Sequence, residues 1–594
     1  MVREETRGLE ILDKRQETLV TRERALIESL TEFLAGFGTP SGDIELLRQT
    51  LSDMGDPFLL VIVGEFNSGK SALVNALVGD EVAKEGSLPT TDQATVLKYS
   101  HDLYETEISP GVIERGVPSD LLQAVSVVDT PGTNAVIREK EQISREFVPR
   151  SDLVLFVTSA DRPFSESERE YMSMIRDWGK KIVLIVNKVD VLPAKEVEAM
   201  RSFVEDQAQQ LLGLVPPVFM VSARGGRKAK ASEAEERFRL MQESGFGELE
   251  NYIANLMGER NLMDLKLQSP LGVAEELVRR YRNVAKERGM LLEEEVKMVD
   301  NLNEALESYR DETRRDFEVR LGQITLAVSE INDRGDAWFE ENSGPKSSFV
   351  GLFGRGDSLQ DRFQKEIVAG TGELVDRKVR ELINWLVYRN VKQWRTIVDY
   401  VELHRKADLT RRLTEDIADD FEQRRERLLE GVITAVNDQV EGYEYRQEAE
   451  RLANSLRSAV SRTAATEADS LGFGGAADQF NESQSLDITG TTIALMVASM
   501  ELGSGGRRKA RSEFKDQTKA LRERLNAAVQ RQLETELDGS VGNMRETLVP
   551  YGNFVNTELR RMKTTESILG KLGSSTKSLA NSINTQANAS NLGL

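Results

Sequence analysis

The sequence predicts two parts in series, an α/β domain with a doubly wound sheet and a long all-α bundle. Short apolar runs alternate with helical segments between residues 57 and about 258, which is the pattern of a doubly wound sheet. From about 262 to 570, prolines and strand-like runs become rare and apolar residues recur at helical spacing among charges. The two parts therefore differ in architecture and require separate cores.

Composition limits the classes of function. The chain has 594 residues, enough for several domains, and 78 Lys and Arg against 99 Asp and Glu give a net charge of −21. That acidic balance argues against a protein that coats nucleic acid, and we expect no nucleic-acid partner. With no cysteine and only two histidines, His101 and His404, the sequence predicts no zinc site.

The first residues are charged and helical in pattern, with no apolar signal segment. Nor does any apolar run reach the ~20 residues that a membrane-spanning helix needs. We therefore expect a cytoplasmic protein.

Residues 1–56 are predicted to form two helices ahead of the first strand, separated by a Gly- and Pro-containing break at 37–43. Such helices are an addition to a minimal nucleotide-binding domain. Their apolar residues need a packing partner, which we expect to be a late helix of the chain.

Six apolar runs are predicted as strands, and a doubly wound sheet binds its ligand at the carboxyl ends of its strands. The runs are Phe58–Val63, Thr95–Tyr99, Val125–Val128, Leu153–Val157, Ile182–Val186 and Val218–Val221.

The stretch Gly64–Ser71 follows the first strand and precedes a helix, and it fits the pattern G-x-x-x-x-G-K-S. In that context the pattern is a P-loop, whose backbone N–H groups wrap a phosphate chain. Lys70 would reach the β- and γ-phosphates, and Ser71 would hold Mg²⁺. The predicted phosphate-contacting residues are Gly64, Asn67, Ser68, Gly69, Lys70, Ser71 and Ala72.

Three further motifs follow in order, each at a predicted strand end: D-T-P-G at 129–132, N-K-V-D at 187–190 and S-A-R at 222–224. The carboxylate of Asp190 can accept from the ring and exocyclic nitrogens of guanine, whereas adenine cannot satisfy it. Together the motifs predict binding of GTP and GDP. The predicted residues are Asp129, Gly132, Asn187, Lys188, Asp190, Ser222, Ala223 and Arg224, with Mg²⁺ held by Ser71, Thr91 and Asp129.

Asn67, Lys70 and Thr91 are the predicted catalytic residues. Thr91 lies where a Mg²⁺-sensing loop belongs, with Thr90 as the alternative, and Thr133 replaces the usual water-orienting Gln after the D-T-P-G motif. The amide of Asn67 can coordinate a monovalent cation such as K⁺ beside the phosphates, which would supply the charge of an arginine finger. An Asn that only tolerates a tight turn is an equally open reading.

The helical part contains two apolar breaks, at 349–354 and 491–500. Softer breaks near 262–270 and 404–409 are candidate hinges. An up-down-up-down bundle places both apolar breaks at the same end, where they would insert into lipid beside basic residues. A buried packing segment is the alternative, and the tail from about 572 is either frayed or a polar helix. The proposed tip residues are Phe349, Val350, Leu352, Phe353, Ile493, Leu495, Met496, Val497, Arg507, Arg508 and Lys509.

The motifs and this arrangement resemble the dynamin superfamily, most of all bacterial dynamin-like proteins and the mitofusin and fuzzy-onion-like branch. The resemblance implies an α/β P-loop GTPase domain plus a long all-α helical bundle (neck and trunk) with an apolar membrane-binding tip. Dynamins proper carry Ser at the position of Asn67 and Gln at that of Phe66, so their charge-compensating route does not transfer unaltered. The implied parts are N-terminal neck helices at 1–56, the GTPase domain at 57–260, a neck and trunk helix at 261–343, a tip loop at 344–357, trunk helices at 358–470, a paddle-like tip at 471–505, and a return helix and tail at 506–594.

The leading hypothesis is a dynamin-like GTPase that hydrolyses GTP to GDP and phosphate and dimerises through its GTPase domains. It would bind and remodel membranes, by fusion, division or tubulation, from the inner face of the cell membrane, with anionic lipids as partners and higher assembly open. A GTP-dependent scaffold switch without membrane insertion is the first alternative. An RNA- or ribosome-maturation GTPase is the second, although no basic RNA-binding module is visible.

Overall fold

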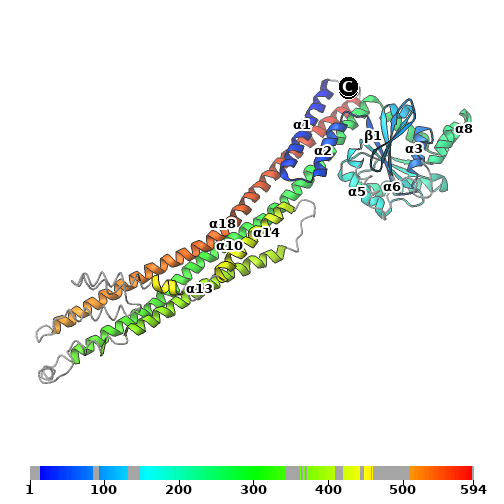
Figure 1. The fold of residues 1–594 in the computed structure, drawn as a ribbon. Coiled ribbons are helices and arrows are strands. Elements are labelled where there is room, and N and C mark those ends of the chain that lie inside the picture. The colour runs from blue at the N-terminus through cyan, green and yellow to red at the C-terminus, as the bar shows by residue number, and fades with distance from the viewer. Residues whose placement is uncertain are drawn as a thin grey trace, which may run out of the picture. The chain divides into compact units, whose positions relative to one another are not determined.

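The computed structural model divides into two compact units, residues 1–289 with 561–594, and residues 290–560 (Figure 1). Each unit is described by itself. The residues that the structure describes are 14–83, 93–130, 147–193, 195–341, 371–408, 419–441 and 507–591, with short pieces between 362 and 458.

The first unit contains an eight-stranded sheet with the order β3-β4-β2-β5-β1-β6-β7-β8. From β5 to β8 all neighbours run parallel, and β2 also pairs in parallel with β4. The β2–β5 and β3–β4 pairs are antiparallel. The strands are β1 (Phe58–Val63), β2 (Ala94–Tyr99), β3 (Tyr104–Ser109), β4 (Val112–Val117), β5 (Val125–Asp129), β6 (Leu153–Ser159), β7 (Ile182–Asn187) and β8 (Val218–Met220).

All six predicted strands are present, but the sequence pattern did not predict β3 and β4. Every residue of β3 is exposed, because β3 is the edge strand of the sheet, and it therefore lacks the apolar signal of a buried strand. The sheet is consequently mixed, with an antiparallel edge on a parallel centre.

Helices pack the two faces of the sheet with separate apolar clusters. One cluster joins the sheet to α3, α7 and α9, and the other joins it to α5 and α6. The helices of this domain are α3 (Lys70–Val78), α5 (Glu166–Asp177), α6 (Val197–Leu212), α7 (Ala223–Lys230), α8 (Ala234–Glu243) and α9 (Phe246–Leu256), with 3-10 turns η1 (Asp120–Gln123) and η2 (Val189–Val191).

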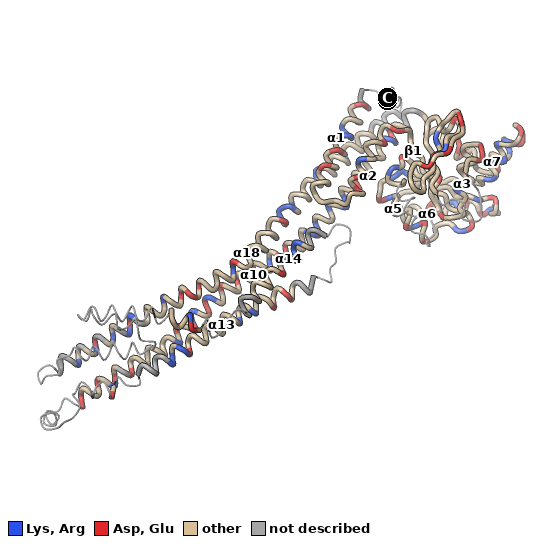
Figure 2. The backbone as a smooth tube through the Cα atoms, in the orientation of Figure 1, with Lys and Arg blue, Asp and Glu red and all other residues tan. Residues whose placement is uncertain are grey.

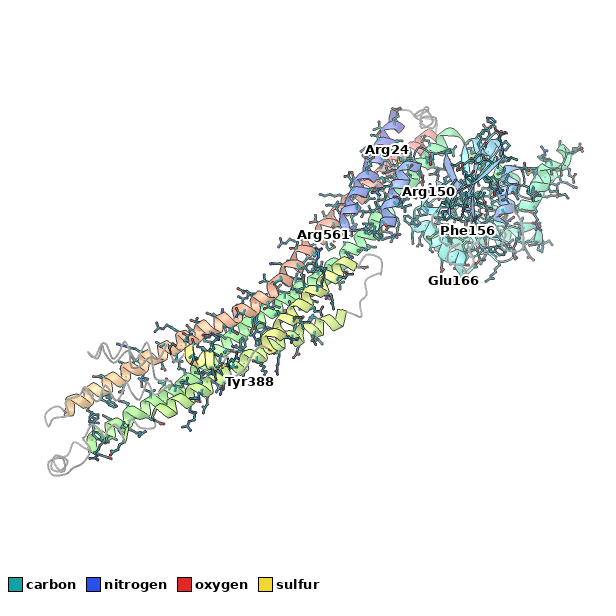
Figure 3. All side chains as sticks on the ribbon, in the orientation of Figure 1. Arg24, Arg150, Phe156, Glu166, Tyr388 and Arg561 are labelled. Atoms are coloured by element: carbon teal, nitrogen blue, oxygen red, sulfur yellow. The ribbon has the colours of Figure 1, made fainter. Side chains whose placement is uncertain are left out.

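The N-terminal helices α1 (Lys14–Phe37) and α2 (Ser41–Asp53) pack beside the start of α10 (Glu259–Glu341) and the end of α18 (Arg507–Asn591). Leu19 of α1 lies in one buried cluster with Leu267 of α10 and Leu579 of α18, which confirms the prediction of a late helix as partner. Arg150, labelled in Figure 3, donates to Asp53 of α2 at 2.7 Å. The tail is helical as far as Asn591, not frayed.

The expected helix break at 262–270 is wrong, because α10 runs through it with Pro270 inside. A proline at position 270 leaves the carbonyl of Lys266, four residues earlier, without its usual N–H donor. Contacts from outside the helix anchor this turn, and Lys180 makes two of them. Its Nζ donates to the backbone oxygen of Ser269 at 3.1 Å and to the Ser269 hydroxyl at 2.7 Å. Lys266, one turn earlier, pairs with buried Asp152 at 3.0 Å. These contacts hold the start of α10 against the residues that precede β6 and β7.

The second unit is a helical bundle of the middle of α10, α13 (Thr371–Asp408), α14 (Asp419–Glu441) and the first part of α18. Its apolar core includes Phe317, Leu382 and Leu533. Lys, Arg, Asp and Glu are distributed along all of its described helices, as Figure 2 shows. A buried polar cluster interrupts the core: Arg425 donates to Glu295 at 3.0 Å, and Tyr551 donates to the other oxygen of Glu295.

The end of α10 and the beginning of α18 lie side by side. Arg511 pairs with Asp336 and, at 2.8 Å, with Glu340, and the Phe514 ring packs on Phe339. The apolar tip residues, 349–353 and 493–497, lie outside the described residues, and Arg507–Lys509 begin α18 without a described side-chain position. Among the helices that are described, none is both long and apolar enough to cross a bilayer.

Candidate guanine-nucleotide site

The P-loop runs from the end of β1 into α3, and two of its glycines are required by close approach. A Cβ on Gly64 would lie 2.1 Å from the backbone oxygen of Val157 in β6. Gly69 has φ +93°, and a Cβ there would lie 2.1 Å from the side-chain nitrogen of Asn187. Only glycine fits both positions, so the loop is held tightly between β6 and the end of β7.

Lys70 is buried at the start of α3 and points back into the loop. Its Nζ donates to the carbonyl oxygens of Gly64 at 3.1 Å and of Glu65 at 3.0 Å. Burial lowers the pKa of Lys70 to about 8, although the negative charges of Asp129, Glu168 and Glu65 act to raise it. The side chain is therefore a cation at neutral pH, held by weak neutral acceptors that a phosphate can replace.

Two oxygens beside Lys70 fit a magnesium ion. The Ser71 hydroxyl donates to Asp129 Oδ2 at 2.8 Å, and Asp129 Oδ1 is buried with no hydrogen-bond partner in the described part of the chain. Burial raises the pKa of Asp129, while Lys70 and Ser71 lower it. Hydroxyl and carboxylate oxygens are the hard ligands that Mg²⁺ prefers, so these residues would hold it. Thr91 and Gly132 lie outside the described residues.

Asn187 joins the phosphate side of the site to the base side. Its Nδ2 donates to the backbone oxygen of Ser68 at 3.0 Å, and its Oδ1 accepts from the backbone N–H of Ala223 at 3.0 Å. The P-loop, the end of β7 and the S-A-R motif thus meet at one buried side chain. Ser222 caps α7 by accepting from the Gly225 N–H at 3.1 Å.

The other base-side residues follow from the same turn. Lys188 has φ +65°, and this left-handed turn leads into η2, where Asp190 is exposed and open to a base. Arg224, in the first turn of α7, is exposed. Asn67 is also exposed and has φ +63°, a backbone region that Asn tolerates better than most residues. That geometry is compatible with an Asn that only tolerates a tight turn, and also with an exposed amide that coordinates a cation. Both interpretations of Asn67 therefore remain open.

The structure adds a network that motif reasoning missed, between the P-loop and the start of α5. Glu65 Oε1 accepts from Ser165 Oγ at 2.6 Å and from the Ser167 hydroxyl. Ser165 is the N-cap of α5 and forms a capping box with Glu168, which also accepts from Thr158 at 3.0 Å. The S-x-x-E spacing at 165–168 was the available signal for the cap, but it carries no sign of the contact with Glu65.

Glu168 supplies a pH-dependent prediction. Burial, reinforced by the Glu65 charge, raises the pKa of Glu168 to about 7. A carboxyl whose pKa is raised in the folded chain stabilises the fold fully below its pKa in the unfolded chain, near 4.5. That contribution is lost as the pH rises from there through 7. Relative to the Glu168→Gln variant, the unaltered chain should therefore lose about 3 kcal/mol of unfolding free energy between pH 4.5 and 8. Denaturant titrations of both chains across that range check it, and parallel pH curves would contradict it.

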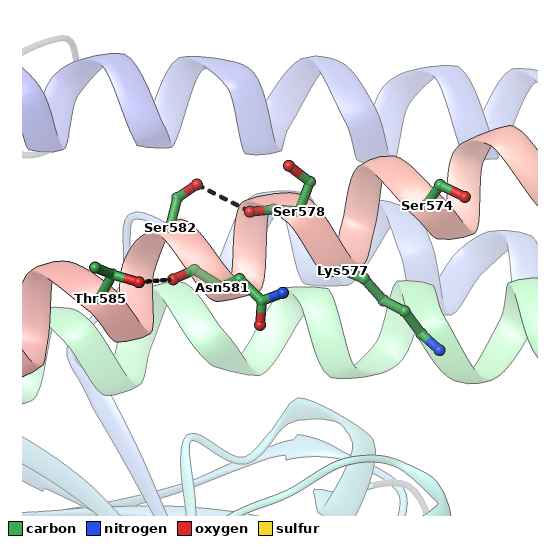
Figure 4. Close-up of a pocket in the computed structure, with 6 residues that line it drawn as sticks. All are labelled: Ser574, Lys577, Ser578, Asn581, Ser582 and Thr585. Carbon is green, nitrogen blue, oxygen red and sulfur yellow. Dashed lines mark hydrogen bonds between the residues drawn. The ribbon is translucent and has the colours of Figure 1, made fainter.

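The polar groove on α18 in Figure 4 is separate from this site. It is lined by Ser574, Lys577, Ser578, Asn581, Ser582 and Thr585. The hydroxyls of Ser574, Ser582 and Thr585 donate to carbonyls one turn earlier in the same helix. These groups serve the helix backbone and offer no built ligand site.

Comparison with known proteins agrees with this geometry. Residues 59–188 match the family model described as 50S ribosome-binding GTPase. A probable transmembrane GTPase, FZO-like, of Arabidopsis thaliana chloroplasts is 33% identical over 321 residues. The chain is therefore similar to fuzzy-onion-like GTPases. The predicted resemblance to this branch of the dynamin superfamily is thereby confirmed.

The similarity of this chain to its relatives covers only part of their length. The aligned region is 50% of this chain and only 35% of the Arabidopsis protein. A tRNA modification GTPase MnmE of Geobacter sulfurreducens is 28% identical over 182 residues, which are 31% of this chain and 34% of that protein. A solved member of an oligomerised bacterial dynamin pair aligns over 95% of each chain with 14% identity and a TM-score of 0.42.

Proposed function

We propose that this chain hydrolyses GTP to GDP and phosphate, and that the cycle drives binding and remodelling of membrane. The observation that carries the enzymatic part is Asn187, which links Ser68 of the P-loop to Ala223 of the base-side motif. One buried amide thus assembles the phosphate and guanine halves of a single site. We propose the same domain boundaries that the sequence predicts.

In the proposed site, different residues bind the phosphates, the guanine and Mg²⁺. Lys70 exchanges the carbonyls of Gly64 and Glu65 for phosphate oxygens, and the loop N–H groups surround the same phosphates. Asp190 selects guanine by accepting from its two nitrogens, since a base without those donors leaves the carboxylate unpaired. Ser71 and Asp129 would hold Mg²⁺, which neutralises phosphate charge when bound.

The membrane part is supported by where the bundle ends. Asp336 of α10 pairs with Arg511 of α18, so the segments that follow α10 and precede α18 leave the second unit from one end. Those segments carry the two apolar stretches, at 349–354 and 491–500. Two apolar stretches beside basic residues favour insertion into an anionic interface. GTPase-domain pairing across the nucleotide and a peripheral place on the inner face of the cell membrane complete the proposal.

A negative charge in the proposed tip should strongly weaken membrane binding. We expect Leu352→Asp and Leu495→Asp each to lower co-sedimentation with anionic liposomes at least about fivefold, because an aspartate at the apolar interface is strongly unfavourable. The matched control is Leu326→Asp on α10, where the leucine is already 66% exposed. If both tip variants sediment like the control, the chain is better explained as a GTP-dependent scaffold switch.

The salt dependence of GTP turnover can distinguish whether Asn67 coordinates a cation or only permits a tight turn. Glycine accepts the positive φ of this position but has no amide oxygen. We expect GTP turnover by the unaltered chain to be about tenfold faster in KCl than in NaCl at equal ionic strength, a gain of transition-state stabilisation by charge. The Asn67→Gly variant should lose that difference. Equal rates in the two salts for the unaltered chain would leave Asn67 as a turn residue.

A further inference from the structure

The second residue of the P-loop, Glu65, places a carboxylate beside a site for phosphate. Its charge acts on Lys70, and its own backbone oxygen accepts from the Lys70 ammonium at 3.0 Å. A carboxylate whose charge acts on the phosphate-binding lysine also repels an anion bound there and can compete with that anion for the same cation. The loop therefore needs a means of keeping the Glu65 side chain away from Lys70.

The start of α5 supplies that means. Ser165 Oγ donates to Glu65 Oε1 at 2.6 Å, and the Ser167 hydroxyl donates to the same oxygen. Ser165 is also the N-cap of α5, with its own hydroxyl accepting from the Glu168 N–H at 3.2 Å. The carboxylate thus lies on a helix N-terminus, whose partial positive charge stabilises an anion.

Glu65 is consequently held through both its backbone and its side chain. Its backbone oxygen is held by Lys70 and its side chain by the two serines of α5. Glu168, which is buried and accepts from Thr158, is a second carboxyl near the loop: its charge acts on Lys70, and the Glu65 charge acts on it. The hydroxyl donors are therefore what favours the observed position of the Glu65 carboxylate over a direct pair with Lys70.

We propose that Ser165 and Ser167 are positioning residues of the nucleotide site, which hold the Glu65 carboxylate on α5 and leave Lys70 available to phosphate. This inference rests on the proposed GTP site and deepens it. Without the hydroxyls, Glu65 turns to Lys70 and competes with the nucleotide. With no charge at position 65, the hydroxyls have nothing to restrain and their loss has no effect on nucleotide affinity.

A double-mutant cycle on the full chain tests this, with a fluorescent GDP analogue as the probe. Ser167 is the residue to change, because Ser165 also caps the helix. Losing a hydrogen bond to a charged group predicts about tenfold weaker binding for Ser167→Ala. In the Glu65→Gln background the same change should alter affinity less than about twofold, and Ser167→Thr should restore binding in the Glu65 background.

The outcomes are distinct. Glu166→Ala, which changes the exposed glutamate between the two serines, is the matched control and should bind like the unaltered chain. Equal losses for Ser167→Ala in both backgrounds, or no loss in either, would overturn the inference and leave the GTP site intact. Failure of the unaltered chain to bind the probe would overturn the proposed function itself, and the inference with it.

Discussion

Replacing Lys70 by methionine is expected to lower GTP turnover at least about 10³-fold. In the proposed site, the ammonium of Lys70 is the cation that the P-loop offers to the phosphates, and preorganised charge in a buried site accounts for effects of this size. Methionine fills much of the same volume without the charge. Phosphate release at saturating GTP measures the change.

The same substitution should not lower the stability of the nucleotide-free chain. Burial lowers the pKa of Lys70 to about 8, so folding favours the neutral amine and the charge is a cost to the fold at pH 7. We expect the thermal midpoint of Lys70→Met to equal or exceed that of the unaltered chain. Lys98→Met, which breaks an exposed pair with Glu114, is the control and should keep normal turnover. A Lys70→Met chain with both normal turnover and lowered stability would assign the lysine a structural role.

The second large effect concerns the helical unit. Glu295 of α10 accepts from Arg425 of α14 and from Tyr551 of α18, and all three side chains are buried. Glu295→Ala removes from the bundle core the carboxylate that accepts from both the guanidinium and the phenol. Breaking a buried pair from one side costs about 3–5 kcal/mol. Loss of helical circular dichroism in a denaturant titration measures it.

The control for this prediction is an exposed pair in the same unit. Glu307 pairs with Arg310 and Arg545 on the surface, and Glu307→Ala should cost less than about 1 kcal/mol. Replacing all three buried partners together, by Glu295→Met, Arg425→Met and Tyr551→Phe, should be far less harmful than Glu295→Ala alone, because no charge is left unpaired. A Glu295→Ala variant as stable as Glu307→Ala would mean that the cluster does not lock the three helices.

Sequence patterns predicted that the motifs of the candidate nucleotide site lie together, because each motif is short and has a fixed place at a strand end. Each motif follows an apolar strand, and the carboxyl ends of parallel strands share one edge of the sheet. The strand order β5-β1-β6-β7 then brings Asp129, the P-loop and Asn187 together, without any need to predict side-chain contacts.

What the sequence did not predict depends on contacts between distant residues. Glu65 and Ser165 are 100 positions apart, and no periodicity links a P-loop glutamate to a helix cap. A helix break was expected near 262–270, yet α10 continues through these residues with Pro270 inside it. There, Lys180 donates to Ser269, and a Cβ on Gly272 would lie 2.7 Å from the backbone oxygen of Trp178. Tertiary packing of this kind overrides the local preference of a proline.

The most direct test of the account is the rate of phosphate release from GTP by the full chain, measured over a protein concentration series with and without anionic liposomes. The account predicts a rate per chain that rises with protein concentration, as GTPase domains pair, and rises again with liposomes. A rate per chain that is unchanged by both would contradict it, and would leave a GTPase whose cycle is not linked to assembly or to membrane.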